Sequence, residues 1–179
     1  SFFPKTAIIL NIEEDHLDFF KDLDDIRNSF REFAKLLPNQ DGTLIINSEI
    51  ENYSELIKDL PCKIVTYGFE QTNDYFASDI CYDENGHPTF KVTKKSGKTD
   101  TYSLNVPGIH NISNALAAIA FADLEGIHYD ITRKALEAFL GTNRRFEYKG
   151  SIGGITIIDD YAHHPTEIKA TLKAAEKYP

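Results

Sequence analysis

The sequence predicts an α/β protein whose mostly parallel sheet has flanking helices and carries an antiparallel meander. Two observations support this prediction. In the first third of the chain, continuous apolar runs alternate with helical patterns, which is the order of a parallel sheet with right-handed crossovers. Between residues 76 and 106 the apolar period becomes two, and Asn-Gly and Ser-Gly pairs separate the runs, as in hairpins.

Composition is that of a soluble globular protein, because 41% of the 179 residues are hydrophobic and 26% are charged. The net charge of −9 argues against nucleic acid or an anionic membrane as a partner. No apolar run approaches a membrane span and no signal peptide opens the chain, so we expect a cytoplasmic protein without membrane insertion. Cys62 and Cys81 lack metal-binding spacing, and we expect both to be small buried residues in a reducing compartment.

Three apolar runs in the amino-terminal part predict buried parallel strands. They are Thr6–Ile12, Thr43–Asn47 and Cys62–Tyr67. A helix capped by Asp22 is expected to reach about Leu37, and a short helix is expected from about Ser48 to Leu60. The polar run N-I-E-E-D-H-L-D, residues 11–18, follows the first strand directly.

A phosphate-loop fragment, Ser96-Gly97-Lys98-Thr99, lies inside the meander. The full motif needs a glycine five positions before Gly97, where Val92 stands, and a helix after the loop. Apolar strand patterns lie on both sides instead. We therefore predict a hairpin turn here.

A long helix is predicted from about Gly108 to Glu125, with Gly126 as its stop. Its many alanines would let it pack closely against the sheet. Asn111 and Asn114 share one face near its amino end, and a carboxamide suits the N6/N7 edge of adenine. Ordinary helix capping is the alternative, and the residues alone leave both open.

The predicted domain boundary follows a second helix, Thr132–Phe139, at the linker of residues 141–143. Residues 1–140 would form one domain and residues 141–179 the beginning of another. Arg144–Tyr148 is expected to be a strand. Its two arginines could grip phosphate, or they could simply be charged residues of an exposed edge strand, which the residues alone favour.

The richest stretch is I-I-D-D-Y-A-H-H-P-T-E-I, residues 157–168. Gly154–Ile158 predicts a buried strand, and Pro165 suits the first position of the next helix. The intervening loop, residues 159–164, holds two carboxylates, a phenol and two imidazoles. Ligands collect at the carboxyl ends of strands in open α/β sheets, so we predict a functional site in this loop.

Four stretches in one order resemble the Mur ligases, ATP-dependent amide-forming enzymes of peptidoglycan synthesis. They are N-I-E-E-D-H-L-D, G-I-H-N-I-S-N-A-L-A-A, R-R-F-E and D-D-Y-A-H-H-P-T-E-I. The last is most similar to the branch that joins L-alanine to UDP-N-acetylmuramate. The murein tripeptide recycling branch is the nearest alternative, and it tends to carry Phe where Tyr161 stands.

The resemblance implies that residues 1–140 are a phosphate-loop-NTPase-like central ATP-binding domain and that residues 141–179 begin a Rossmann-like domain. It implies ATP and Mg²⁺ as cofactors, with UDP-N-acetylmuramate and L-alanine as substrates. By the same resemblance His16 would bind magnesium, Asn111 and Asn114 adenine, Arg145 the nucleotide phosphates, and Asp160 would lie on the nucleotide side. Tyr161 and His163 would face the muramyl substrate and the amino acid, so we expect Arg145, Tyr161 and His163 to act in catalysis.

The family's phosphate loop, its upstream magnesium-binding glutamate and its UDP-binding domain have no counterpart here, so the chain is expected to be a fragment that is inactive alone. Two other hypotheses remain. One is a non-catalytic adenine-nucleotide-binding module. The other is a metal-dependent phosphohydrolase using Asp15, His16, Asp159, Asp160 and His163. Oligomeric state is left unknown.

Overall fold

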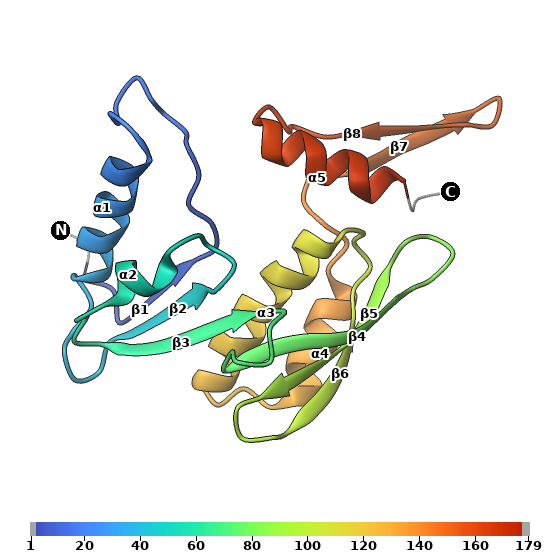
Figure 1. The fold of residues 1–179 in the computed structure, drawn as a ribbon. Coiled ribbons are helices and arrows are strands. Elements are labelled where there is room, and N and C mark those ends of the chain that lie inside the picture. The colour runs from blue at the N-terminus through green and yellow to red at the C-terminus, as the bar shows by residue number, and fades with distance from the viewer. Residues whose placement is uncertain (1–2, 177–179) are drawn as a thin grey trace.

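A computed structural model describes residues 3–176 of the chain (Figure 1). Its main sheet has six strands in the order β1-β2-β3-β4-β5-β6, and a separate hairpin pairs β7 with β8. The strands are β1 (Thr6–Ile9), β2 (Thr43–Asn47), β3 (Lys63–Gly68), β4 (Tyr75–Tyr82), β5 (Pro88–Lys94), β6 (Thr99–Ser103), β7 (Glu147–Ile152) and β8 (Ile155–Asp159). The helices are α1 (Leu23–Ala34), α2 (Tyr53–Ile57), α3 (Ile109–Leu124), α4 (Tyr129–Ala138) and α5 (Pro165–Ala175).

The parallel half of the sheet confirms the predicted fold class. β1 pairs with β2 and β2 with β3, both in parallel, with Thr43 opposite Thr6 on one side and Lys63 on the other. Both faces are covered, which explains why the β2 sequence is apolar without alternation. The carboxyl ends of β1 and β2 therefore lie at one edge, where the polar residues 11–18 begin.

The antiparallel half is the predicted meander of β4, β5 and β6. Gly97 has a φ of +85° in the β5–β6 turn, so the phosphate-loop fragment is a hairpin turn, as predicted. A register shift between Ser78 and Cys81 interrupts the β4–β5 ladder. Cys81 is exposed there, so the prediction that both cysteines are buried is wrong for Cys81 and right for Cys62.

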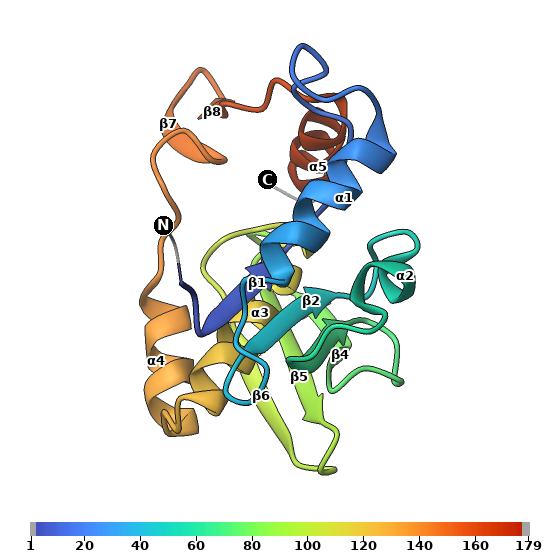
Figure 2. The same ribbon diagram turned by 90° about the vertical axis from the view of Figure 1, so that its left-hand side faces the viewer.

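Helices α1 and α3 cover opposite faces of the sheet (Figure 2). Asp22 caps α1 as predicted, since its carboxylate accepts from the Asp25 amide at 3.0 Å. The alanines of α3 allow the close approach that its sequence predicted, with Ala115, Ala117 and Ala120 all buried against β2, β3 and β4. Gly126 ends α3 with a φ of +71°.

Two predicted helix boundaries are wrong. The predicted helix of residues 48–60 is only the single turn of α2, because Asn52 before it adopts a left-handed conformation. α4 begins at Tyr129 rather than Thr132, because the His128 side chain caps it and accepts from the Asp130 amide at 3.3 Å. An imidazole cap is outside the usual Ser, Thr, Asp and Asn set, so the start was missed.

Residues 144–176, here named the carboxyl-terminal unit, comprise the β7–β8 hairpin and α5. The predicted strand Arg144–Tyr148 is wrong at its start: Arg144 and Phe146 have φ values of +59° and +48°, and the strand begins at Glu147. The predicted buried strand is also corrected, because Ile155 is 67% exposed in β8. Pro165 does begin α5 as predicted.

Within residues 3–176, none of the helices combines the length and the apolar character that crossing a membrane requires.

Candidate functional site

The loop between β8 and α5, residues 160–164, is named the β8 loop here, and Asp160 organises it. One oxygen of Asp160 accepts from the Phe146 amide at 2.9 Å and from the Thr171 hydroxyl at 3.1 Å, and the other accepts from the Ala162 amide at 2.7 Å. One carboxylate therefore ties the start of β7, the β8 loop and α5 together. Any contact of Asp160 with a nucleotide would add to this positioning role.

The two arginines before β7 lie against the same loop, on a turn rather than a strand. The Arg144 guanidinium stacks 4.5 Å from the Tyr161 ring centre, and the Arg144 carbonyl accepts from the Tyr161 amide at 2.8 Å. Arg145 holds Glu167 with its Nη1 at 3.3 Å from Oε1, and about half of its side chain is exposed. The rest of the Arg145 guanidinium is thus available to an anion.

Glu167 is an acceptor for the backbone of the β8 loop, receiving the amides of His163 and His164 at 3.3 and 3.5 Å. Desolvation acts to raise the pKa of Glu167, but these two amides and Arg145 outweigh it, so the pKa lies below its ordinary value. Glu167 is therefore ionised at neutral pH and anchors the loop at the α5 amino end.

His163 and Tyr161 are the exposed side chains of the β8 loop. Their rings meet edge to face with centres 5.2 Å apart, and His163 Nδ1 donates to the Tyr161 carbonyl at 3.0 Å. This bond fixes the orientation of the ring, and 69% of the His163 side chain is exposed. The arrangement leaves a phenol and an imidazole nitrogen presented together to solvent.

His164 was singled out by no sequence argument, yet it joins the β8 loop to the loop after β1. Its Nε2 donates to the Glu14 carbonyl at 2.9 Å, and its Nδ1 lies 3.2 Å from Oε2 of Glu13. The contact spans 150 positions in sequence. Only the tertiary structure could reveal it, because nothing local distinguishes His164 from its neighbour.

The start of α3 lies under the carboxyl-terminal unit. Gly108 has a φ of +98°, and a Cβ there would stand 2.6 Å from the His110 ring and 3.4 Å from Ala174 of α5. Burial lowers the pKa of His110; the charge of Asp160 acts in the opposite direction, and that of Arg145 lowers it further. His110 is therefore neutral at pH 7 and sits between the two units.

The two asparagines of α3 differ in whether the side-chain amide already has a hydrogen-bond partner in the protein. Asn111 is half-buried, and its Nδ2 donates to the Pro107 carbonyl at 2.7 Å, so this amide partly serves the helix start. Asn114 is exposed one turn further on the same face. Of the two, Asn114 offers the complete donor–acceptor pair.

The loop between β1 and α1, residues 10–22, is named the β1 loop here and carries His16. His16 has a φ of +52°, and three-quarters of its side chain is exposed. Its Nε2 lies 3.7 Å from Oδ2 of Asp15, and Asn11 donates to Glu13 at 2.6 Å. The predicted polar cluster thus lies beyond the carboxyl end of β1.

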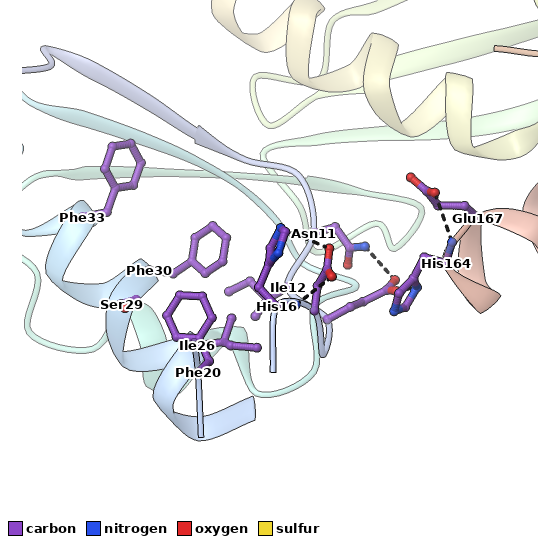
Figure 3. A pocket seen from close by; sticks show the side chains of 12 residues that line it. Asn11, Ile12, His16, Phe20, Ile26, Ser29, Phe30, Phe33, His164 and Glu167 are labelled. Atoms are coloured by element: carbon purple, nitrogen blue, oxygen red, sulfur yellow. Dashed lines mark hydrogen bonds and ion pairs between the residues drawn. The ribbon is translucent and has the colours of Figure 1, made fainter. Parts of the chain in front are cut away.

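A cavity of about 610 Å³ opens between the β1 loop, α1 and the amino end of α5 (Figure 3). Its apolar side is formed by rings and aliphatic side chains of the β1 loop and α1, and its polar side by both loops. The residues that line it are Asn11, Ile12, Glu13, Asp15, His16, Phe20, Ile26, Ser29, Phe30, Phe33, His164 and Glu167. His16 and His164 therefore border one space, although they come from different units.

The fit of Mg²⁺ to these residues is incomplete. Mg²⁺ prefers six ligands, mostly oxygen, and the described residues contain no group of three or more His, Cys, Asp or Glu placed to hold a metal ion. Among residues 3–176, the carboxylate paired with His16 is that of Asp15.

Comparison with known proteins identifies the family. Residues 1–122 match the Mur ligase middle domain, and residues 144–179 match the domain described as Mur ligase, glutamate ligase domain. The chain belongs to the Mur ligase family. The first part of this Mur ligase chain therefore matches one domain of the family and the last part matches another. The two domains follow one another along the chain in the same order as the four motifs.

Two sequence relatives of this Mur ligase chain carry the name UDP-N-acetylmuramate–L-alanine ligase. The protein from Lachnospira eligens is 52% identical over 180 residues, and the protein from Agathobacter rectalis is 50% identical over 179 residues. All of the chain is covered in both cases. The chain spans 39% of the length of each relative.

Solved structures agree with the fold. The UDP-N-acetylmuramate-alanine ligase MurC from Thermotoga maritima is 31% identical with a TM-score of 0.80, covering 98% of this chain and 38% of its own. MurF from Acinetobacter baumannii is 26% identical with a TM-score of 0.86, covering 99% and 38%. A murein peptide ligase from Psychrobacter arcticus is 32% identical with a TM-score of 0.72, covering 98% and 35%.

Proposed function

We propose that this chain is part of an ATP-dependent ligase that joins L-alanine to the carboxylate of UDP-N-acetylmuramate in the cytoplasm, during peptidoglycan synthesis. The observation that supports this best is the convergence of the four motifs: the β8 loop contacts the turn at Arg144 and Arg145 and the β1 loop, and α5 packs on the start of α3. The proposed domains are residues 1–140 and 141–179.

The proposed reaction has two steps. A carboxylate oxygen of the muramyl substrate attacks the γ-phosphorus of ATP, the bond to the β-phosphate oxygen breaks, and an acyl phosphate and ADP form. The alanine amine then attacks the acyl carbon, loses a proton, and inorganic phosphate leaves. Negative charge builds on oxygen in both steps, so a fixed guanidinium such as that of Arg145 would stabilise it.

The proposed residue roles follow from which hydrogen-bonding atoms of each side chain have no partner within the protein. Asn114, with Asn111 beside it, would bind adenine, and Arg145 would reach the phosphates. Tyr161 and His163 would face the muramyl substrate and the amine, while Asp160 holds the loop on the nucleotide side. His16 would supply one magnesium ligand, which a Mg²⁺ titration of the His16→Ala variant tests.

Two rival functions are weaker. A metal-dependent phosphohydrolase needs a ligand cluster, which residues 3–176 do not contain. A stand-alone nucleotide-binding module would not need Tyr161 and His163 to be presented together to solvent. Neither has an observation in its favour comparable to the convergence of the motifs.

The test requires the segments of the ligase that this chain lacks, and a relative can provide them. In a chimaera, this chain replaces the matching segment of the Lachnospira eligens relative, and ADP release is followed with UDP-N-acetylmuramate or N-acetylmuramate and different amines. Release that needs UDP-N-acetylmuramate and free L-alanine supports the proposal. Release that ignores alanine and requires an alanine-initiated tripeptide assigns the chain to the recycling ligases instead.

A further inference from the structure

Arg144 belongs to the R-R-F-E motif, yet it has no role in the proposed function. The two arginines of this motif are directed to different partners. Arg145 reaches Glu167 at the amino end of α5, at 3.3 Å. Arg144 lies over the Tyr161 ring, 4.5 Å from its centre, and its Nε is 3.8 Å from Oδ2 of Asp159. The two guanidinium groups are thus directed apart rather than joined in one phosphate clamp.

The positive charge of Arg144 is balanced by its surroundings. Asp159 and Glu147 are the carboxylates beside it, and the Glu147 carboxylate also accepts the Arg144 backbone amide at 2.7 Å. Lys149 adds a second cation, with its Nζ 2.7 Å from Glu147 and 4.0 Å from Asp159. Two cations and two carboxylates therefore form a neutral group where β7 begins and β8 ends. Arg144 is not an isolated charge that needs an anionic ligand.

Tyr161 is held by Arg144 through both its backbone and its ring. The Tyr161 amide donates to the Arg144 carbonyl at 2.8 Å, and the Arg144 guanidinium covers the ring. The Tyr161 side chain is 52% exposed and otherwise meets the His163 ring edge to face. Within residues 3–176, no hydrogen bond fixes the phenol oxygen. The cation over the ring is therefore the contact that orients this phenol.

The physical basis of this contact is the attraction of a cation to the face of an aromatic ring. An exposed ring without such a contact samples several rotamers. A cation within about 6 Å of the ring centre favours one of them, and a planar guanidinium can also stack on the ring. Asp159 and Glu147 restrain Arg144 in turn. The ordered β7–β8 hairpin is thereby connected to the phenol of the β8 loop.

We propose that Arg144 is a positioning residue that holds the Tyr161 phenol toward the muramyl substrate and the incoming amine. The proposal rests on the proposed function, in which Tyr161 faces these substrates. Arg144 contacts no reacting atom and, unlike Arg145, binds no phosphate of ATP. Its loss is therefore expected to lower turnover and to leave nucleotide affinity unchanged.

The contact itself is tested by NMR on the chain without added segments. We expect nuclear Overhauser effects between the Arg144 side chain and the Tyr161 ring protons. Methylene signals of Arg144 should be shifted upfield, because protons over the face of an aromatic ring are shielded. The shift should vanish in Tyr161→Leu, which has no ring. Arg144 signals that are the same in both chains overturn the proposal.

Arg144→Gln removes the cation and keeps the turn. Arg144 has a φ of +59°, and glutamine also has a Cβ, so the backbone strain stays the same. The bonds to Glu147 and Tyr161 are made by the backbone of residue 144 and should survive. Hydrogen exchange at the Tyr161 amide should therefore be unchanged. Exchange faster by more than about tenfold would assign the side chain to holding the turn and overturn the proposal.

The kinetic readout uses the chimaera. Arg144→Gln should lower kcat by about two- to fivefold, the factor that corresponds to one exposed cation–π contact, with ATP affinity unchanged. Arg145→Gln should instead weaken ATP binding. An Arg144→Gln variant that loses ATP affinity as Arg145→Gln does would make Arg144 a phosphate ligand and overturn the proposal. If even the unsubstituted chimaera releases no ADP, the proposed function fails, while the NMR measurement still decides whether Arg144 orients Tyr161.

A double-mutant cycle shows whether Arg144 acts through Tyr161. In the Tyr161→Leu chimaera, Arg144→Gln should cause no further loss of kcat, because the ring that Arg144 positions is gone. Arg144→Lys in the unsubstituted chimaera should restore part of kcat, because it keeps a cation near the ring without the planar stack. Losses from the two substitutions that simply multiply would show that Arg144 acts elsewhere and contradict the proposal.

The matched control is Lys98→Gln. Lys98 also lies over a tyrosine, with its Nζ 5.8 Å from the Tyr129 ring centre, and its side chain is 58% exposed, as is that of Arg144. This pair connects the β5–β6 turn to α4 and is not part of the β8 loop. Lys98→Gln should leave kcat unchanged. A loss equal to that of Arg144→Gln would attribute both effects to general destabilisation and overturn the proposal.

Discussion

At the scale of single residues, the chemistry of this site depends on which polar atoms the fold leaves unused. Asp160 has both oxygens engaged, and Asn111 has its amide nitrogen on Pro107. Arg145 and Asn114 keep donors free. The sequence motifs do not distinguish between these residues. Their hydrogen bonds do, because a side chain whose polar atoms are already bonded positions its neighbours, whereas one with free donors can bind a ligand.

The asparagines of α3 give the first prediction. In the chimaera, Asn114→Ala should weaken ATP binding by about 1–3 kcal/mol, the range for one bidentate base contact. Asn111→Ala should also lower the stability of the protein by about 1 kcal/mol, because it removes the bond to Pro107. Calorimetric ATP titration and urea unfolding measure the two effects.

The control is Asn28→Ala on the exposed face of α1, which should change neither quantity. Unchanged ATP affinity in Asn114→Ala would remove Asn114 from the adenine site. Equal loss of affinity and of stability in both variants would favour ordinary helix capping.

Glu167 gives a pH-dependent prediction. Its pKa is lowered in the folded state, so its stabilisation is fully present above 4.5, the ordinary value, and is lost as pH falls through the folded value. Glu167→Gln should speed hydrogen exchange of α5 amides at pH 7, by an amount equivalent to about 0.5–1.5 kcal/mol. In acid below the folded value, where the Glu167 carboxylate is protonated, the difference should disappear.

Glu125→Gln at the end of α3 is the matched exposed control and should leave α5 exchange unchanged. A Glu167→Gln effect of the same size at both pH values would show that the ionised carboxylate is not what anchors the loop.

At the scale of elements, long periodic segments could be predicted and short irregular ones could not. The apolar runs of β1 to β3 and the alanines of α3 reflect burial, which sequence periodicity reports directly. The Arg144 turn depends on its amide donating to Glu147 at 2.7 Å and on a left-handed φ, neither of which has a periodic pattern. That is why a strand was expected there.

Helix α3 gives the element-scale prediction. Ala120 is fully buried against the sheet, so Ala120→Leu should overpack the interface and lower the free energy of unfolding by about 1–3 kcal/mol. Ala118 is exposed on the same helix, and Ala118→Leu should have little effect. Urea unfolding of both variants checks this, and equal destabilisation would contradict close packing at Ala120.

At the scale of the whole molecule, the two units differ in how much they bury. The main sheet has two clusters of buried side chains, whereas among residues 144–176 only Ala174 is buried. The motifs could be found from the sequence, but not how the units meet, because the His164 contact joins positions with no local relation.

This difference predicts unequal local stability. Amides of β7 and β8 should exchange at least about 100-fold faster than those of β4 and β5, because exposed ladders with few apolar contacts open locally. Hydrogen exchange followed by mass spectrometry or NMR resolves the two regions. Equal protection of both hairpins would mean that the carboxyl-terminal unit folds together with the main sheet.

The central claim is that this chain supplies the nucleotide and amine side of an alanine-adding ligase. The most direct measurement is L-alanine-dependent ADP release by the chimaera with UDP-N-acetylmuramate present, compared with the same chimaera carrying His163→Ala. We predict release that requires both substrates and falls by at least about tenfold in the variant, typical of losing a positioned imidazole. Release without L-alanine, or undiminished by the substitution, would contradict the account.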